Sequence, residues 1–128
     1  MMASDATVLV ADDEPHVVAL VEHLLRKMGC EVLTAADGEQ ALAKIRTSAP
    51  TIAIVDGSMP GRSGYEVSEA LREDSGVGSR PYLMMLTAGG RDLDRARAEA
   101  AGVDEFLTKP FSPSKLRARV REILASSE

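Results

Sequence analysis

Two adjacent aspartates, Asp12 and Asp13, follow the first apolar segment of the chain, "TVLVA" (7–11). Two carboxylates this close repel each other unless a cation lies between them. The pair therefore indicates either a charged helix start, in which Asp13 or Glu14 caps the helix that follows, or a metal site. The residues that end the other apolar segments bear on this choice.

Three more polar residues stand where other apolar segments end: Asp56, Thr87 and Lys109. Each alone has an ordinary explanation. Asp56 before Gly57 suits a turn, Thr87 can cap a loop, and Lys109 can be a solvated surface charge. These separate explanations do not account for the shared placement of the three residues at segment ends.

Five apolar segments alternate with five helical patterns along the chain. The predicted strands are residues 7–11, 31–35, 51–56, 81–86 and 102–107. The predicted helices begin near Pro15, Asp37, Ser63, Arg91 and Ser112. Such alternation is typical of an α/β domain whose parallel strands are joined by right-handed crossovers. Because sites in these sheets form beyond the carboxyl ends of the strands, we expect the polar residues above to meet at one edge.

The expected cluster has the chemistry of a site for a hard cation and a phosphoryl group. Carboxylates from Asp12, Asp13 and Asp56 suit Mg²⁺, which prefers oxygen ligands. A carboxylate can also act as the nucleophile and form an acyl phosphate. Phosphoryl transfer needs positioning and charge neutralisation, which the Lys109 ammonium and the Thr87 hydroxyl can provide. The sequence therefore favours the metal site over the helix cap.

The composition limits the class of protein. The chain has 128 residues, 45% of them hydrophobic and 27% charged, as expected of one globular domain. Its net charge of −5 argues against direct binding of nucleic acid. No apolar run approaches the roughly 20 residues of a membrane span, and the N-terminus lacks a signal pattern, so we expect a cytoplasmic protein without membrane contact. The single cysteine, Cys30, is expected to be a buried thiol.

Four motifs stand in order at the predicted strand ends: "VADDEP", "IVDGSMPGRSG", "LTA" and "TKPF". Together they resemble a response-regulator receiver domain of two-component signalling, of the chemotaxis-regulator kind. The resemblance covers residues 6–125, so the whole chain, 1–128, is expected to be a single receiver domain. It implies a flavodoxin-like doubly wound sheet of five parallel strands in the order 2-1-3-4-5, with five helices.

The resemblance also implies a role for each site residue. Asp56 resembles the phosphoacceptor, which takes a phosphoryl group from the phosphohistidine of a sensor histidine kinase or a histidine phosphotransfer protein. The implied Mg²⁺ ligands are Asp12, Asp13, Asp56 and the backbone carbonyl of Ser58. The residues implied to contact the phosphoryl group or to act in the switch are Thr87, Ala88, Lys109 and Phe106. Pro110 matches a position where the family holds a cis peptide.

Phosphorylation is expected to change a surface and thereby control a downstream protein or an output domain. Thr87 would swing toward the phosphoryl group and leave space into which Phe106 can turn. The fourth helix (within 91–102), the fifth strand and the last helix would form the altered surface, through which a homodimer is possible. The basic residues of the last helix either face acids of a partner copy, among them Asp92, Asp94 and Glu99, or are solvated; they are Lys115, Arg117, Arg119 and Arg121.

Other functions fit the same elements less well. A Mg²⁺-dependent aspartyl-phosphate phosphatase normally has a second acid two residues after its nucleophile, and position 58 is a serine. A flavin or nucleotide module would have a glycine-rich phosphate loop after the first strand, where this chain has acids. A scaffold that acts without phosphorylation remains a third alternative. We therefore expect a signalling switch and not a multiple-turnover enzyme. Gly57, Gly89 and Gly90 further predict flexible loops beside the site.

Overall fold

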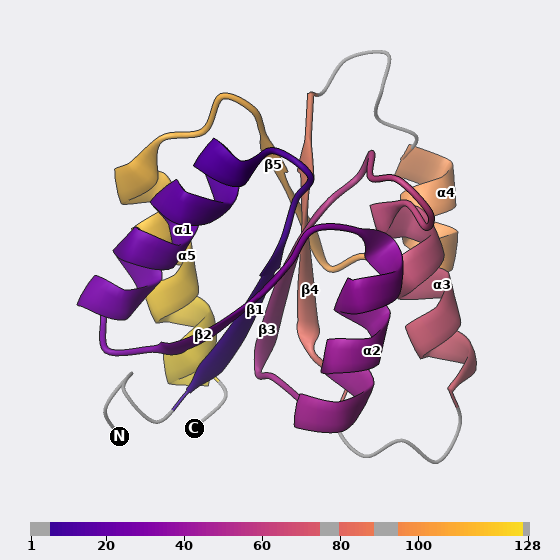
Figure 1. The fold of residues 1–128 in the computed structure, drawn as a ribbon, viewed down its shortest axis with the longest axis horizontal. Coiled ribbons are helices and arrows are strands. Elements are labelled where there is room, and N and C mark those ends of the chain that lie inside the picture. The colour runs from indigo at the N-terminus through magenta and orange to yellow at the C-terminus, as the bar shows by residue number, and fades with distance from the viewer. Residues whose placement is uncertain (1–5, 75–79, 89–94, 127–128) are drawn as a thin grey trace.

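The computed structural model describes residues 6–74, 80–88 and 95–126 and shows a five-stranded parallel sheet with helices on both faces (Figure 1). The strands are β1 (Thr7–Ala11), β2 (Glu31–Ala35), β3 (Ile52–Asp56), β4 (Tyr82–Thr87) and β5 (Glu105–Thr108). The helices are α1 (Pro15–Lys27), α2 (Gly38–Ser48), α3 (Gly64–Glu73), α4 (Arg95–Ala101) and α5 (Pro113–Ser126). The strand order β2-β1-β3-β4-β5 confirms the predicted flavodoxin-like fold.

The helices cover the sheet in two groups, with α1 and α5 on one face and α2, α3 and α4 on the other (Figure 1). β3 is buried along its whole length, as expected of a central parallel strand covered on both faces. Alternate residues of each strand then enter different clusters. Val8 and Ile54 pack toward α1 and α5, whereas Leu9 and Val55 pack toward α2 and α3.

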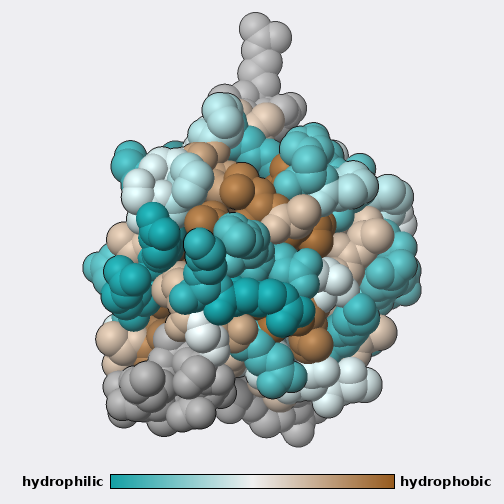
Figure 2. Space-filling view, turned by 60° about the vertical axis from the view of Figure 1, so that its left-hand side comes forward, coloured by the Kyte–Doolittle hydropathy of each residue, from teal (hydrophilic) through white to brown (hydrophobic). Residues whose placement is uncertain are grey.

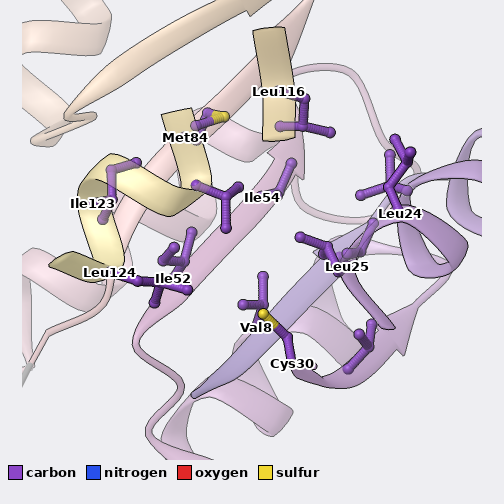
Figure 3. Close-up of a cluster of buried hydrophobic side chains, with 14 of the residues drawn as sticks. Val8, Leu24, Leu25, Cys30, Ile52, Ile54, Met84, Leu116, Ile123 and Leu124 are labelled. Carbon is purple, nitrogen blue, oxygen red and sulfur yellow. The ribbon is translucent and has the colours of Figure 1, made fainter. Parts of the chain in front are cut away.

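Figure 3 shows the first of these clusters. Side chains of the sheet, among them Val8, Ile52, Ile54 and Met84, meet Leu24 and Leu25 of α1 and Leu116, Ile123 and Leu124 of α5. Cys30 belongs to the same cluster and is buried, which confirms the expectation of a buried thiol. Both clusters pack against the sheet and fix the positions of its strands. The residues at the carboxyl edge of the sheet are positioned by these strands.

The helix starts follow the local signals in the sequence. Pro15 is the first residue of α1, where its missing N–H costs no hydrogen bond. Ser63 and Glu66 form a reciprocal capping box at the start of α3. At the start of α2, Asp37 accepts a hydrogen bond from the Gln40 amide, but the Gln40 side chain accepts from Ala36 and not from Asp37.

The largest difference from the predicted elements lies in the fifth strand, which begins at Glu105 and not at residue 102. Gly102 adopts a φ of 86°, in the left-handed region that ends a helix, and its N–H bonds back to the carbonyl of Ala98. The apolar Val103 is partly buried against the second cluster from this connection, without being part of a strand. The predictions for Gly89 and Gly90 lie outside the described residues.

On the side of α1 and α5, the surface consists mostly of hydrophilic residues, and smaller hydrophobic areas lie among them (Figure 2). In the described part of the chain, Leu20 on α1 is the only large hydrophobic residue that is exposed. No helix among these residues is long and apolar enough to cross a membrane.

Candidate functional site

The carboxyl ends of four strands bring the predicted site residues to one edge of the sheet. Asp12 follows β1 directly, Asp56 ends β3, Thr87 ends β4, and Lys109 follows β5. Backbone hydrogen bonds fix these ends relative to one another. The amide of Lys109 donates to the carbonyl of Thr87 at 2.7 Å, and the amide of Gly57 donates to the carbonyl of Leu86 at 2.8 Å.

Three carboxylates lie close together at this edge: those of Asp12, Asp13 and Asp56. Each offers an oxygen within 4.8 Å of the others. Asp12 and Asp56 are buried, whereas Asp13 is exposed. Backbone amides orient both buried groups, since Asp12 Oδ1 accepts from the Glu14 N–H at 2.9 Å and Asp56 Oδ1 accepts from the Ser58 N–H at 3.4 Å.

The acids at the start of α1 do not serve as caps through their side chains. Glu14 is the N-cap residue of α1, and its side chain makes no capping hydrogen bond. Asp13 precedes the cap position, and Asp12 is buried below it. The structure therefore does not show the side-chain cap that Asp13 or Glu14 could have provided.

The carboxylate set fits a hard divalent cation. Mg²⁺ prefers oxygen ligands and keeps several waters, which an edge with two buried carboxylates and one exposed carboxylate allows. Asp12 Oδ2 supports this fit. Within residues 6–74, 80–88 and 95–126 this oxygen contacts the Lys109 ammonium at 2.8 Å and makes no further hydrogen bond. A buried oxygen with that much remaining acceptor capacity suits a cation and its ordered waters.

The Lys109 ammonium lies among three carboxylates. Its Nζ is 2.8 Å from Asp12 Oδ2, 2.9 Å from Glu14 Oε1 and 3.5 Å from Asp56 Oδ2. Burial lowers the pKa of Lys109, but the charges and hydrogen bonding of these carboxylates more than offset that effect, so the net pKa is raised. Lys109 is therefore a permanent positive charge at the site.

Asp56 is held at a higher pKa than an ordinary aspartate. Burial raises the pKa of its carboxyl group and the nearby charge of Asp12 raises it further, while Lys109 and the Ser58 amide lower it, with a net value of about 6. Ionisation of Asp56 in the metal-free protein is therefore less favourable than ionisation of a solvent-exposed aspartate.

A pocket opens at this edge beside the carboxylates. Its lining includes six of the predicted site residues: Asp13, Asp56, Ser58, Thr87, Ala88 and Lys109. Glu14, Tyr65 and Arg97 also line the pocket. The guanidinium of Arg97 lies 4.8 Å from the centroid of the Tyr65 ring. The sequence carried no signal for the pair, because only the packing of α4 on α3 brings Arg97 to Tyr65.

Three other predictions fall on described residues near the pocket. The Lys109–Pro110 peptide bond is cis. Phe106 is half-buried on β5 against the second core cluster, with the Arg95 guanidinium 5.9 Å from its ring centroid. The Gly57 amide donates to the Leu86 carbonyl, and the Gly57 carbonyl accepts from the Gly64 N–H. The flexibility predicted for this loop stays a prediction.

Among the basic residues of α5, Arg119 has partners within the described part of the chain. Arg119 Nε donates to Glu105 Oε2 at 2.8 Å, and Arg119 also donates to Glu105 Oε1. The Tyr82 hydroxyl completes the group by donating to Glu105 Oε1 at 2.6 Å. The hydrogen bonds from Arg119 and Tyr82 hold the pKa of Glu105 below its usual range, although burial opposes this. Of the acids predicted to face this helix from a partner copy, Asp92 and Asp94 lie outside the described residues, and Glu99 is exposed on α4.

Comparison with known proteins identifies the family. The model of the response regulator receiver domain matches residues 8–121. The chain belongs to this family, whose members are signalling domains of two-component systems. It is 39% identical over 121 residues to the alkaline phosphatase synthesis transcriptional regulatory protein PhoP of Bacillus subtilis, covering 94% of this chain and 49% of PhoP. The chain thus spans about half the length of the first curated relatives it matches.

Solved structures agree with this assignment. The chemotaxis response regulator CheY4 of Vibrio cholerae superimposes with a TM-score of 0.83 at 34% identity, covering 92% of this chain and 98% of CheY4. The receiver domain of the sensor histidine kinase PA1611 from Pseudomonas aeruginosa superimposes with a TM-score of 0.83 at 27% identity, covering 94% of this chain and 98% of that domain. That domain was solved with a magnesium ion coordinated in its active-site cleft.

Proposed function

We propose that this chain is a phosphorylation-activated switch in which Asp56 accepts a phosphoryl group from the phosphohistidine of a histidine kinase or a histidine phosphotransfer protein. One observation carries the proposal. The buried carboxylate of Asp56 ends the central strand β3 between two further carboxylates and the Lys109 ammonium, and it lines an open pocket. A carboxylate in this setting is both oriented by the backbone and reachable by a donor.

In the proposed reaction, a carboxylate oxygen of Asp56 attacks the phosphorus of the donor. The phosphorus–nitrogen bond breaks, the imidazole nitrogen keeps the electron pair and gains a proton from solvent, and Asp56 becomes an acyl phosphate. Lys109 opposes the charge of the transferred oxygens, and the Thr87 hydroxyl and the Ala88 amide donate hydrogen bonds to them.

Magnesium is the proposed cofactor. Asp12, Asp13, Asp56 and the backbone carbonyl of Ser58 would hold the ion, which supplies further positive charge against the phosphoryl oxygens when bound. The cluster of three carboxylates, one of them the buried Asp12 beside Lys109, supports this assignment. The magnesium ion in the PA1611 receiver domain, a structural relative, is consistent with it.

The proposed output is a change in the surface formed by α4, β5 and α5, which would control a target protein, a second copy of this chain or an output domain. Thr87 would turn toward the phosphoryl group, and the half-buried Phe106 would move further inward. Phe106 has no hydroxyl to hold it outside, so Phe106→Tyr should reduce the response of this surface to phosphorylation. Residues 6–125 would act as one receiver domain in this account.

Intact mass spectrometry tests the proposal. The native protein is incubated with phosphoramidate, with and without Mg²⁺, beside Asp56→Asn and Asp13→Asn. The proposal predicts the gain of one phosphoryl group that requires Mg²⁺, is absent from Asp56→Asn and is reduced in Asp13→Asn. A folded native protein that gains no phosphoryl group would instead support a scaffold that acts without phosphorylation.

A further inference from the structure

Glu14 lines the pocket, and neither a side-chain cap of α1 nor the proposed metal site uses its carboxylate. Its N–H donates a hydrogen bond to Asp12 Oδ1 at 2.9 Å. Its carbonyl accepts hydrogen bonds from the amides of Val17 and Val18 in the first turn of α1. These backbone bonds fix the residue, while its side chain makes no capping contact. The side chain instead reaches across the pocket to Lys109.

The contact with Glu14 differs from the other contacts of the ammonium. Lys109 Nζ donates a hydrogen bond to Glu14 Oε1 at 2.9 Å, whereas it lies 3.5 Å from the proposed acceptor oxygen of Asp56. The Glu14 side chain is 48% exposed, and its second oxygen is 3.7 Å from the exposed His16 imidazole. Water can therefore replace Lys109 beside Glu14 at little cost, which is not true of the fully buried side chain of Asp12.

We propose that Glu14 is a positioning residue that holds Lys109 at the open side of the pocket while Asp56 carries no phosphoryl group, and that it releases Lys109 on phosphorylation. This inference rests on the proposed function. Lys109 Nζ lies 2.8 Å from Asp12 and 2.9 Å from Glu14 but 3.5 Å from Asp56 Oδ2, so a move toward a phosphoryl group on Asp56 draws the ammonium away from one of its two nearer partners. Glu14 is the partner that is easiest to exchange, because solvent already reaches it. Glu14 thereby opposes formation of the phosphorylated state.

Three substitutions distinguish an effect of the contact with Lys109 from an effect of the charge of Glu14 alone. Glu14→Gln removes the charge and keeps the length of the side chain. Glu14→Asp keeps the charge but withdraws it by one methylene group from Lys109. Glu22→Gln is the matched control, because it removes the same charge from the same helix and also breaks an ion pair, the one with Arg26.

The first readout is the affinity of the Mg²⁺-loaded protein for beryllium fluoride, an analogue of a phosphoryl group on a carboxylate. Both Glu14 variants should bind it about two- to fivefold more tightly than the native protein, the range expected for a partly exposed ion pair, and Glu22→Gln should not. Equal affinity in Glu14→Asp and the native protein would show that charge alone acts and would overturn the inference. Unchanged or weaker binding by Glu14→Gln would also overturn it.

The second readout is a double-mutant cycle in urea without Mg²⁺, using Glu14→Gln, Lys109→Met and the combined variant. The inference predicts a coupling of about two- to fivefold in the unfolding equilibrium constant, and additive effects would overturn it. Because this cycle needs no phosphoryl analogue, it is read even if the native protein does not bind beryllium fluoride. A native protein that does not bind beryllium fluoride would count against the proposed function of Asp56. It would then also count against the release of Lys109.

Discussion

The ammonium of Lys109 lies 2.8 Å from Oδ2 of Asp12, so the residue after the last strand is paired with the residue after the first. Asp12 is fully buried, and its Oδ1 is already bonded to the Glu14 amide. Lys109 thus neutralises a charge that would otherwise be isolated below the pocket. The same ammonium is near the proposed phosphoacceptor, so one side chain contributes both to the stability of the site and to its proposed chemistry.

The first prediction follows from this pairing. Lys109→Met should lower the free energy of unfolding at neutral pH without metal by about 2–4 kcal/mol, because it leaves the carboxylate of Asp12 buried and unpaired. Mg²⁺ should restore part of the loss by taking over the positive charge. Urea unfolding with and without Mg²⁺ measures both effects. Lys115→Met, at an exposed lysine of α5, is the control; a loss no larger than the control's would contradict the prediction.

The second prediction concerns the pH dependence that Asp56 imposes. Its pKa is about 6 in the folded protein and about 4 in an unfolded chain, so the folded state binds the proton more tightly. The free energy of unfolding should therefore fall as pH rises from about 4 to about 6, and stay lowered above that range. Asp56→Asn carries no such charge. It should exceed the native protein in stability by about 1–3 kcal/mol at pH 7.5 without Mg²⁺, and by much less at pH 3.5.

Urea unfolding at the two pH values checks this prediction. Glu99→Gln, which removes one charge from an exposed position on α4, controls for net charge. An Asp56→Asn protein that is less stable than the native protein at pH 7.5 would show that the carboxylate cluster does not strain the metal-free fold.

The third prediction concerns metal binding. Mg²⁺ should raise the free energy of unfolding of the native protein by about 1.4 kcal/mol when its concentration is ten times its dissociation constant. Asp13→Asn should lose most of this gain, because Asp13 is a proposed ligand of the ion. The variant should fold normally, because Asp13 is exposed. Thermal unfolding in a magnesium series measures it, with potassium chloride of matched ionic strength as the control. Equal stabilisation by the two salts would indicate screening and no specific site.

The fourth prediction concerns Arg119, which binds Glu105 within the chain. Arg119→Met should lower the free energy of unfolding by about 1 kcal/mol at pH 7. Because Arg119 lowers the pKa of Glu105, this contribution is present at neutral pH and should be lost as pH falls through that lowered pKa. Arg117→Met, two residues away on the same helix, should have little effect at either pH. A loss that is independent of pH would point to packing of the arginine stem instead.

The carboxyl edge of the sheet could be predicted from the sequence because it depends on a simple rule. Residues that end or follow buried parallel strands meet at one edge, so the sequence alone predicts that Asp12, Asp56, Thr87 and Lys109 lie together. The end of β3 was predicted to the residue. The start of β5 was not, because the apolar Val103 continues the hydrophobic pattern while Gly102 bends the chain away from the strand.

Contacts made by long side chains could not be predicted in this way. The sequence placed Glu14 beside the aspartate pair, but only as a possible cap, and the 2.9 Å contact with Lys109 depends on how α1 and the end of β5 approach each other. The backbone contacts of Gly57 are not evident from the sequence either, because its amide bonds the carbonyl of Leu86 on a neighbouring strand.

Locating the phosphoryl group on the chain tests the central claim most directly. The native protein is treated with phosphoramidate and Mg²⁺ and then with borohydride, which reduces an aspartyl phosphate to homoserine, and its peptides are sequenced by mass spectrometry. The account predicts homoserine at position 56 alone, and none when Mg²⁺ is omitted. Homoserine at position 12 or 13, or at no position in a protein that is folded and binds Mg²⁺, would contradict it.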